Sequence, residues 1–468
     1  MSKLLIAAAL AAACVSANTA LFPERLRGGR VYREAVAAER AHHARIGYVP
    51  NMTKNWCPAP IDHSNPSLGT FQDKFYYDTS YFNGTYCMFY LNGEGPLGSS
   101  VGGYMAELAQ GLNACTVTIE HRWYGESLPG GTLLNKALLT QTLTVDQAMQ
   151  DVRLLMTYFE TNVIKRNVTW FLVGGSYSGG MTVWLNEKYP GLFKASWAAS
   201  GVVRATFAFT DYDGHVAAVT SADCSNGLRQ IMQFADWAYE QDAARLFAMF
   251  NVPSYNTKTD FMWAMADMSA SSVQYSMNTQ MCAEILPVPQ EPWAALAKYA
   301  AFMVRDWGEG FAASCYYSTH CLASKSLSSG WAAGGYSWIW ECCNQMAWWQ
   351  IGYPNSIRNR NISTEYFTNQ CRAAFYENTT SDPWTFNKRH HGLHPQTAGY
   401  IIATQGSDDP WSTTGLKYDV GPTFPVNTAE CANCGHCGSM MSPRATDPPN
   451  LQLQRTLVKN SLTQWLAR

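Results

Sequence analysis

The stretch Thr169–Gly180, which reads TWFLVGGSYSGG, constrains the fold more than any other part of this chain. An apolar run at Trp170–Val173 ends at Ser176, which lies between small residues, and a helical pattern continues from Met181 up to Pro190. A serine on a strand-to-helix turn is typical of a nucleophile elbow, in which small neighbours let the hydroxyl project from a strained backbone. We therefore predict a strand, a sharp turn that carries Ser176, and a helix.

The turn departs from the usual G-x-S-x-G pattern, because residues 174–178 read Gly-Gly-Ser-Tyr-Ser. Serine is small enough to be accommodated at position 178. An isolated motif of this kind is nevertheless as often a Gly/Ser-rich turn without chemistry as it is a nucleophile. Its meaning depends on finding a base and an acid elsewhere in the chain.

The order of the acidic residue and the histidine along the chain tests whether Ser176 is a nucleophile. In α/β-hydrolases the serine is followed first by the acid and then by the histidine that takes the serine proton. Only His436 follows His394 along the chain, so it is the candidate base. The acid should follow a buried strand, and the apolar run Tyr400–Thr404 leads into Asp408 and Asp409. Either aspartate could also be an ordinary turn residue, and His436 a structural or metal-binding histidine.

A second Asp-Pro-Trp sequence occurs at 382–384, but no apolar run precedes it and it comes before the strand instead of after it. We interpret it as an ordinary turn. The three candidates Ser176, one of the two aspartates and His436 remain, in the order that an α/β-hydrolase requires.

Four separated segments of the chain resemble the S28 serine peptidases, a family that includes carboxypeptidases and dipeptidyl peptidases. They are Glu120–Ser127 (EHRWYGES), Gly174–Tyr177 (GGSY), Asp409–Trp411 (DPW) and Gly435–Cys437 (GHC). The first resembles the family's E-H-R-Y-Y-G-E-S block and is far more specific than a G-x-S-x-G motif. The resemblance runs from about residue 57 to the C-terminus, and its D-P-W segment implies that Asp409 is the acid.

The resemblance implies an α/β-hydrolase fold with an inserted helical cap. It also implies a secreted or lysosomal serine exopeptidase that cleaves peptides near one terminus, after proline or a small residue, through an acyl-enzyme. Ser176, Asp409 and His436 would be catalytic. Two departures from the family pattern bear on rate and specificity, namely Ser178 in place of glycine or alanine and the sequence Gly-Ser-Met at 438–440.

Other site residues are candidates on weaker grounds. The backbone N–H of Tyr177 and one from the loop 92–95, with Gly93 as the candidate, would form the oxyanion hole. Trp411 is the candidate pocket wall, although a tryptophan after a turn is more often simply packed. Glu94 is a candidate for binding a substrate amine. We expect Arg122 and Glu126 to be buried and paired beneath the site, in a structural role.

The pattern of elements predicts five parts. A cationic start, an apolar run and small residues indicate a signal peptide at 1–17, followed by an N-terminal arm or propeptide at 18–55. Alternating strands and helices, such as the strands Tyr86–Leu91 and Cys115–Ile119 and a helix opened by a capping box at Thr144, predict the first part of a hydrolase domain at 56–203. A Met- and Trp-rich helical stretch at 204–384 predicts the cap, and 385–468 completes the hydrolase domain.

Composition agrees with a secreted enzyme. Fourteen cysteines are present, of which Cys14 lies in the predicted signal peptide, so thirteen would reach an oxidising compartment and at least one would stay unpaired. We expect glycosylation at five N-x-S/T sequons, which are Asn51, Asn83, Asn167, Asn361 and Asn378. The net charge of −2 gives no electrostatic reason to expect nucleic acid or an anionic membrane as a partner, whereas peptide substrates are expected. A homodimer is left open.

Three alternatives come from other classes of protein. The cluster Cys431, Cys434, His436 and Cys437 has the ligand types of a zinc site, but cysteines of a secreted protein are more often oxidised, and we expect no metal and no cofactor. A second alternative is an esterase or lipase with the same triad. A third is a catalytically weak, hydrolase-like binding protein.

Overall fold

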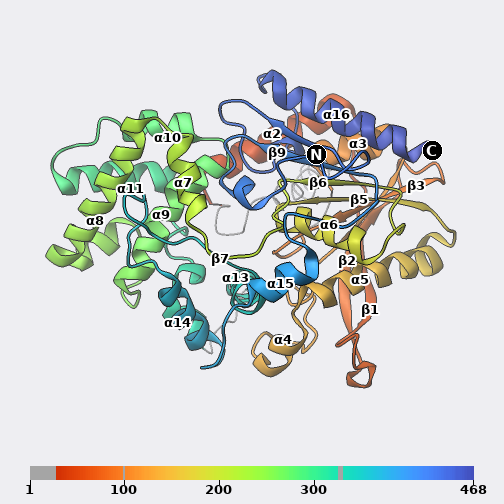
Figure 1. Cartoon of the computed structure of the whole chain (residues 1–468), viewed down its shortest axis with the longest axis horizontal. Helices are drawn as coiled ribbons and strands as arrows, with labels where there is room; N and C mark the ends of the chain where they lie inside the picture. The colour runs from red at the N-terminus through yellow and green to blue at the C-terminus, as the bar shows by residue number, and fades with distance from the viewer. Residues whose placement is uncertain (1–27, 99–100, 325–329) are drawn as a thin grey trace, which may run out of the picture.

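The computed structural model of the chain describes residues 28–98, 101–324 and 330–468 (Figure 1). The signal peptide predicted at 1–17 lies outside these residues. The predicted N-terminal arm, where it is described, contains helix α2 (Arg30–Ile46) and the start of the first strand. Arg30 at the start of α2 is tied to Asp306 by an ion pair of 2.9 Å.

The centre of the molecule is an eight-stranded sheet in the order β1-β2-β4-β3-β5-β6-β9-β10. Its strands are β1 (Thr53–Pro60), β2 (Thr70–Asp78), β3 (Tyr86–Leu91), β4 (Cys115–Ile119), β5 (Thr169–Gly175), β6 (Ala195–Ala199), β9 (Ile401–Gly406) and β10 (Val426–Ala429). The pairs β1-β2 and β2-β4 are antiparallel, and all other pairs are parallel. This mostly parallel sheet, with helices on its faces, has the α/β-hydrolase fold, as predicted.

The central strands are buried along nearly their whole length because helices cover both faces of the sheet. In β3, Cys87 and Phe89 belong to the core on one side, where α5 and α6 lie, and Met88 and Tyr90 belong to the core on the other, with α3 and α16. The predicted strands at 86–91 and 115–119 are confirmed as β3 and β4. The helices around the sheet are α3 (Gly103–Gly111), α4 (Lys136–Thr142), α5 (Val145–Tyr158), α6 (Tyr177–Lys188) and α16 (Pro449–Leu466).

The capping box predicted at the start of α5 is only half present. The side chain of Thr144 accepts a hydrogen bond from the N–H of Gln147, as expected. The side chain of Gln147 does not return the bond, because it contacts Asp62 and Arg122 instead. The helix therefore begins at the predicted residue, but its third residue serves a tertiary contact.

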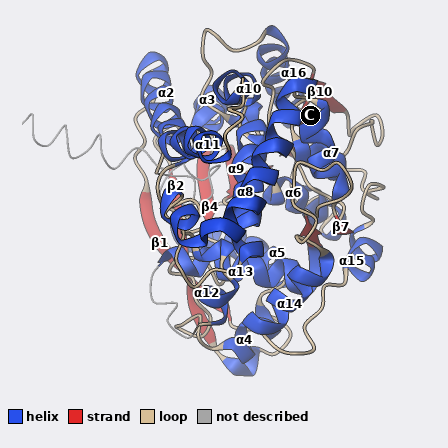
Figure 2. Cartoon of the chain, turned by 90° about the vertical axis from the view of Figure 1, so that its left-hand side faces the viewer, coloured by secondary structure: helices blue, strands red, loops and turns tan. Residues whose placement is uncertain are grey.

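Between β6 and β9 the chain is mostly helical, and we call residues 204–390 the helical segment. Its helices are α7 (Thr210–Ala218), α8 (Ala222–Met249), α9 (Lys258–Gln274), α10 (Asn278–Ile285), α11 (Pro292–Trp307), α12 (Thr319–Ala323), α13 (Gly330–Glu341), α14 (Thr364–Ala374) and α15 (Pro383–His390). Two short strands, β7 (Thr206–Ala208) and β8 (Ala347–Trp349), pair within it. Figure 1 shows α8–α11 gathered on one side of the sheet, and Figure 2 shows α8 and α9 in front from that side.

The second Asp-Pro-Trp sequence is a helix start, so the prediction of an ordinary turn was wrong. Asp382 caps α15 by accepting a hydrogen bond from the N–H of Thr385, and Pro383 occupies the first turn. Proline is well suited to that place, because the N–H that it lacks would have no partner there. Trp384 is 79% exposed.

Five disulfides join ten of the described cysteines, as expected for an oxidising compartment. They are Cys87–Cys115, Cys224–Cys282, Cys315–Cys321, Cys343–Cys371 and Cys431–Cys434. Cys57, Cys342 and Cys437 are free and buried. The expectation that at least one cysteine stays unpaired is therefore confirmed within the described residues.

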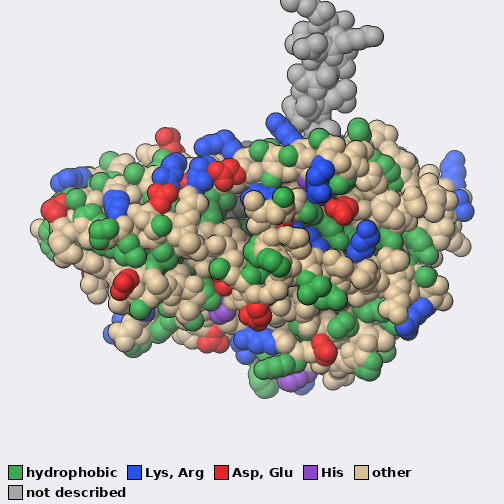
Figure 3. Space-filling view, turned by 90° about the horizontal axis from the view of Figure 1, so that it is seen from above, with side chains coloured by type: hydrophobic (Ala, Val, Ile, Leu, Met, Phe, Trp, Pro, Cys, Tyr) green, Lys and Arg blue, Asp and Glu red, His purple; other side chains and the backbone are tan. Residues whose placement is uncertain are grey.

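Positive and negative side chains are interspersed on the face that Figure 3 shows, in keeping with the small net charge of −2. Within the described ranges, none of the helices combines the length and apolar character needed to cross a membrane. The side chains of all five sequon asparagines are exposed to solvent.

Candidate active site

Ser176 lies on a strained turn between β5 and α6. Its backbone has φ 59° and ψ −126°, a conformation that non-glycine residues rarely adopt. The turn closes tightly, because a Cβ atom added to Gly174 would lie 2.2 Å from the carbonyl oxygen of Ser178. The backbone N–H of Ser176 donates to the carbonyl oxygen of Ala199 at the end of β6, over 2.9 Å. The structure therefore has the elbow that the sequence predicts.

Asp409 and His436 are brought together from the loops after β9 and β10. The Nδ1 atom of His436 lies 2.7 Å from Oδ2 of Asp409, and both side chains are buried. The other oxygen of Asp409 accepts the N–H of Trp411, and the N–H of His436 donates to the carbonyl oxygen of Gln274. Each side chain is therefore fixed by a second contact. The other ring nitrogen of His436, Nε2, is buried without a hydrogen-bond partner among the described residues.

The protonation of His436 is governed by two opposing effects. Burial lowers the pKa of its imidazole, but the charge of Asp409 and the hydrogen bond to it raise that pKa well above its ordinary value. An imidazole held in this way keeps a proton on Nδ1 and presents Nε2 as the atom that exchanges protons.

The loop that carries His436 packs against the elbow. A Cβ atom added to Gly175, the residue before Ser176, would lie 3.1 Å from the sulfur of Cys437, the residue after His436. The N–H of Cys437 also lies 2.8 Å from the Oγ of Ser200, to which it donates. The elbow and the His436 loop thus meet at the carboxyl ends of the parallel strands β5, β6, β9 and β10. Ligands bind at this end of the sheet in parallel α/β folds.

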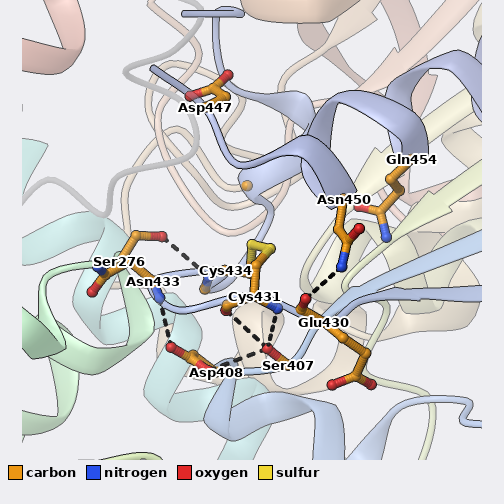
Figure 4. Close-up of a disulfide and its surroundings, with 12 residues drawn as sticks. Ser276, Ser407, Asp408, Glu430, Cys431, Asn433, Cys434, Asp447, Asn450 and Gln454 are labelled. Atoms are coloured by element: carbon orange, nitrogen blue, oxygen red, sulfur yellow. Dashed lines mark hydrogen bonds between the residues drawn. A yellow bond between two sulfur atoms is a disulfide. The ribbon is translucent and has the colours of Figure 1, made fainter.

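Asp408 contacts the loop of the Cys431–Cys434 disulfide and stabilises it (Figure 4). One of its oxygens accepts from the side chain of Asn278 at 2.9 Å and from the N–H of Asn433 at 2.7 Å. The geometry thus separates the two aspartates that spacing alone left open. Asp409 faces the histidine, and Asp408 fixes the loop before it.

The cysteine cluster around His436 has no free thiolate pair, because Cys431 and Cys434 are joined. Among the described residues, no group of three His, Cys, Asp or Glu side chains is arranged to hold a metal ion.

The two residues predicted for the oxyanion hole lie next to the elbow. Tyr177 is the first residue of α6, so its N–H is one of the helix donors without an intrahelical partner. Gly93, in the loop after β3, has φ 91°, and a Cβ atom on it would lie 3.0 Å from Oγ of Ser178. That hydroxyl is buried and has no hydrogen-bond partner in the described parts of the chain. Ser178, which departs from the family pattern, thus lies against the loop 92–95.

The side chain of Tyr177 belongs to a buried polar cluster that the sequence did not predict. Its hydroxyl lies 2.9 Å from Oε1 of Glu341 and 3.1 Å from Nε2 of His121, and the hydroxyl of Tyr124 donates to the other oxygen of Glu341. Burial raises the pKa of the Glu341 carboxyl and of the Tyr177 hydroxyl, and Glu94 adds to the effect on Tyr177. The predicted site residue Glu94 is therefore close to this cluster.

The predicted pairing of Arg122 with Glu126 was wrong. Arg122 is fully buried, but its partner is Asp151 on α5, with contacts of 2.5 and 2.7 Å. Glu126 is half exposed and pairs with the partly exposed Lys54 and with the buried Lys74. The buried glutamate of this loop is Glu120, which accepts hydrogen bonds from the N–H groups of residues 97, 126 and 127.

A chain of aromatic rings connects His436 to the elbow. The ring of Trp411 lies 6.4 Å from His436 and 5.9 Å from Trp348, and Trp338 lies 5.8 Å from Trp348 and 5.6 Å from Tyr177. Trp338 and Trp411 are partly exposed. Trp411 also donates its indole N–H to Gln274 over 3.0 Å, so its ring is held in place. Of these rings, sequence reasoning identified only Trp411 as a pocket candidate.

Comparison with known proteins places the chain among peptidases. Residues 59–458 match the profile of the family described as "Serine carboxypeptidase S28". The chain belongs to the S28 family of serine peptidases. It is therefore a serine-type peptidase whose substrates are peptides.

Three members of the S28 family show how far the similarity extends. "Probable serine protease EDA2" of Arabidopsis thaliana is 25% identical over 84% of this chain and 82% of that protein. "Thymus-specific serine protease" of Mus musculus is 23% identical over 90% and 88%. "Lysosomal Pro-X carboxypeptidase" of Bos taurus is 22% identical over 87% and 86%. The similarity covers both the sheet and the helical segment.

Proposed function

We propose that this S28 peptidase cleaves peptides near one terminus, after proline or a small residue, through the triad Ser176, His436 and Asp409. The observation that carries the proposal is the contact of 2.7 Å between Asp409 and His436, on a loop packed against an elbow that carries Ser176. This is the division of roles that acyl transfer by a serine requires.

In the proposed reaction, Nε2 of His436 takes the proton of the Ser176 hydroxyl as its oxygen attacks the scissile carbonyl carbon. The tetrahedral oxyanion accepts hydrogen bonds from the N–H groups of Tyr177 and Gly93. His436 then gives its proton to the leaving amine, and an acyl-enzyme forms. Water repeats these steps on the acyl-enzyme, and Asp409 stabilises the imidazolium in both halves.

The preference for proline or a small residue immediately before the scissile bond is attributed to the aromatic rings between His436 and Tyr177. Proline presents a compact apolar ring that packs well on aromatic side chains. Trp411 and Trp338, which are partly exposed, are suitably placed to contact such a ring. Glu94 is the proposed contact for a substrate amine.

The cap over the active site is proposed to be residues 204–384, nearly all of the helical segment, inserted between residues 56–203 and 385–468 of the hydrolase domain. Support comes from its own residues at the site, because Gln274 contacts His436 and Trp411. A secreted or lysosomal location is proposed from the five disulfides, the exposed sequons and a relative named as lysosomal.

The test uses two matched reporter peptides, one with a free N-terminus and proline second, and one with a blocked N-terminus and a penultimate proline. Both are incubated with the purified protein and with Ser176→Ala. Turnover of one peptide that vanishes in the variant supports the proposal and decides between a dipeptidyl peptidase and a carboxypeptidase. Turnover of ester substrates alone would favour an esterase, and no serine-dependent turnover would leave a binding role.

A further inference from the structure

The geometry points to Glu341 as a positioning residue for the nucleophile elbow. From the end of α13 it holds the side chain of Tyr177 in a hydrogen-bonded chain that continues to His121. The inference rests on the proposed function, in which the N–H of Tyr177 stabilises the oxyanion.

The position of Glu341 is unusual for a carboxyl group. Its side chain is fully buried, and its two oxygens make hydrogen bonds with the hydroxyls of Tyr124 and Tyr177. These tyrosines lie in the loop after β4 and at the start of α6, in the part of the chain that forms the central sheet (the sheet domain). A buried carboxyl group is stable only when its hydrogen-bonding capacity is satisfied. Tyr177 is 164 residues away along the chain, so this contact joins the helical segment directly to the residue after Ser176.

The protons of the cluster can be counted from the geometry. Nδ1 of His121 lies 2.9 Å from the carbonyl oxygen of Arg122, which can only accept, so Nδ1 carries a proton. The single hydroxyl proton of Tyr177 can then be donated either to Glu341 or to Nε2 of His121. In the first case His121 is an imidazolium that donates to the tyrosine oxygen and Glu341 is a carboxylate. In the second, Glu341 is a neutral acid that donates to the tyrosine oxygen and His121 is neutral.

Both arrangements hold the same number of protons and satisfy every hydrogen bond, and they differ by a shift of two protons along the chain. Tyr177 is therefore held from both sides in either state. The ring of Tyr177 is also packed against Trp184 and Trp338, so the hydroxyl contacts fix the remaining freedom of the side chain. The hydroxyl contacts anchor the far end of the Tyr177 side chain, which restrains the Cα atom of Tyr177 and with it the Ser176–Tyr177 peptide plane that carries the N–H. The direction of that N–H therefore depends on Glu341.

Two substitutions at Glu341 distinguish a loss of its hydrogen bonds to the tyrosines from a change in the residue itself. In Glu341→Gln the amide NH₂ donates to the Tyr177 oxygen and the amide oxygen accepts from Tyr124, which reproduces the neutral arrangement. We expect kcat to stay within about 3-fold of the wild type. Glu341→Leu removes both acceptors, and we expect kcat to fall by about 10- to 100-fold with KM nearly unchanged, somewhat less than the loss of a whole oxyanion donor.

Ser337→Ala is the matched control. Ser337 lies one turn earlier in α13 and donates to the carbonyl oxygen of Trp123 over 2.6 Å, so it also joins the helix to the sheet domain but does not touch Tyr177. We expect its kcat to equal that of the wild type. A loss in Ser337→Ala as large as that in Glu341→Leu would overturn the inference, because the effect would then come from the docking of α13.

Tyr177→Phe provides the second route if Glu341→Leu does not fold. It removes only the hydroxyl, and we expect a kcat loss of about 10-fold at unchanged KM. A wild-type kcat in folded Glu341→Leu or in Tyr177→Phe would contradict the positioning role of Glu341.

The labelling rate of Ser176 with a fluorophosphonate distinguishes a failure of the proposed function from a failure of the role assigned to Glu341. Wild-type protein that neither hydrolyses the reporter peptides nor labels would refute the proposed function and this inference with it. Wild-type protein that does both, beside an equally active Glu341→Leu, would refute only the inference.

Discussion

Nδ1 of His436 lies 2.7 Å from Oδ2 of Asp409, and the side chains of both residues are almost fully buried. In a buried pair this close, the carboxylate decides both the tautomer and the basicity of the imidazole. Burial is the largest single effect and lowers the pKa of His436, but the charge of Asp409, the hydrogen bond to it and the interaction with Cys437 together raise that pKa.

We predict that kcat/KM falls as the pH is lowered through the pKa of His436, because only the neutral imidazole can take the serine proton. Since that pKa is raised, the midpoint should lie above the ordinary 6.5 of a histidine. In Asp409→Asn burial dominates, so the midpoint should move to lower pH and kcat should fall by about 10⁴-fold. The measurement is kcat/KM against pH for both proteins. An unchanged midpoint in the variant would contradict the assignment of Asp409.

Asp408→Ala should destabilise the protein with little effect on catalysis. The substitution leaves the partly buried N–H of Asn433 and the buried side-chain amide of Asn278 without their acceptor, which costs about 1–3 kcal/mol. We expect a lower thermal unfolding midpoint and a kcat within about 10-fold of the wild type. Asp408→Asn, which keeps one acceptor, is the control, and its thermal unfolding midpoint should lie between those of Asp408→Ala and the wild type. A kcat as low as that of Asp409→Asn would mean that the two aspartates share the acid role.

Gly93→Ala should impair catalysis through the oxyanion loop. The backbone of Gly93 has φ 91°, which alanine adopts only with strain, and the added Cβ atom would press on Oγ of Ser178 at 3.0 Å. We expect kcat to fall by about 10- to 100-fold. Gly95→Ala in the same loop is the matched control, because its Cβ atom meets no other group within 4 Å. Equal kcat values for the two variants would remove Gly93 from the oxyanion hole.

The elements that the sequence predicted are those with a local signal. Apolar runs at β3, β4 and β9 and small residues around Ser176 follow from backbone and packing rules that act over a few residues. The acid and the base could be located because their order along the chain is restricted in this fold.

Contacts between distant segments carry no such signal. Glu341 is a single glutamate in a tryptophan-rich stretch, and nothing near it in the sequence indicates that Tyr177 is its partner. The same reason explains the error at Arg122, whose partner was sought in the nearby Glu126 although Asp151 lies 29 residues away. Buried ion pairs are formed by tertiary packing, which local patterns do not encode.

Arg358 holds helices α7 and α9 of the helical segment together. Its guanidinium is fully buried and pairs with Asp213 on α7 at 2.8 Å and with Asp267 on α9 at 2.9 Å. These helices are joined again where the hydroxyl of Tyr212 donates to Gln274, the residue that holds the ring of Trp411. The ion pairs of Arg358 therefore stabilise the two helices that hold Trp411, the proposed pocket wall.

Arg358→Leu leaves two buried carboxylates without their cation, and we expect it to destabilise the protein by about 3–5 kcal/mol. The control is Arg389→Met, because Arg389 is 56% exposed in its pair with Asp146 and its loss should cost about 0–1 kcal/mol. Thermal and denaturant unfolding measure both effects. Adding Asp213→Asn and Asp267→Asn to Arg358→Leu should restore part of the stability, since the cost lies in the unpaired charges. Equal unfolding midpoints for Arg358→Leu and Arg389→Met would show that Arg358 does not stabilise the segment.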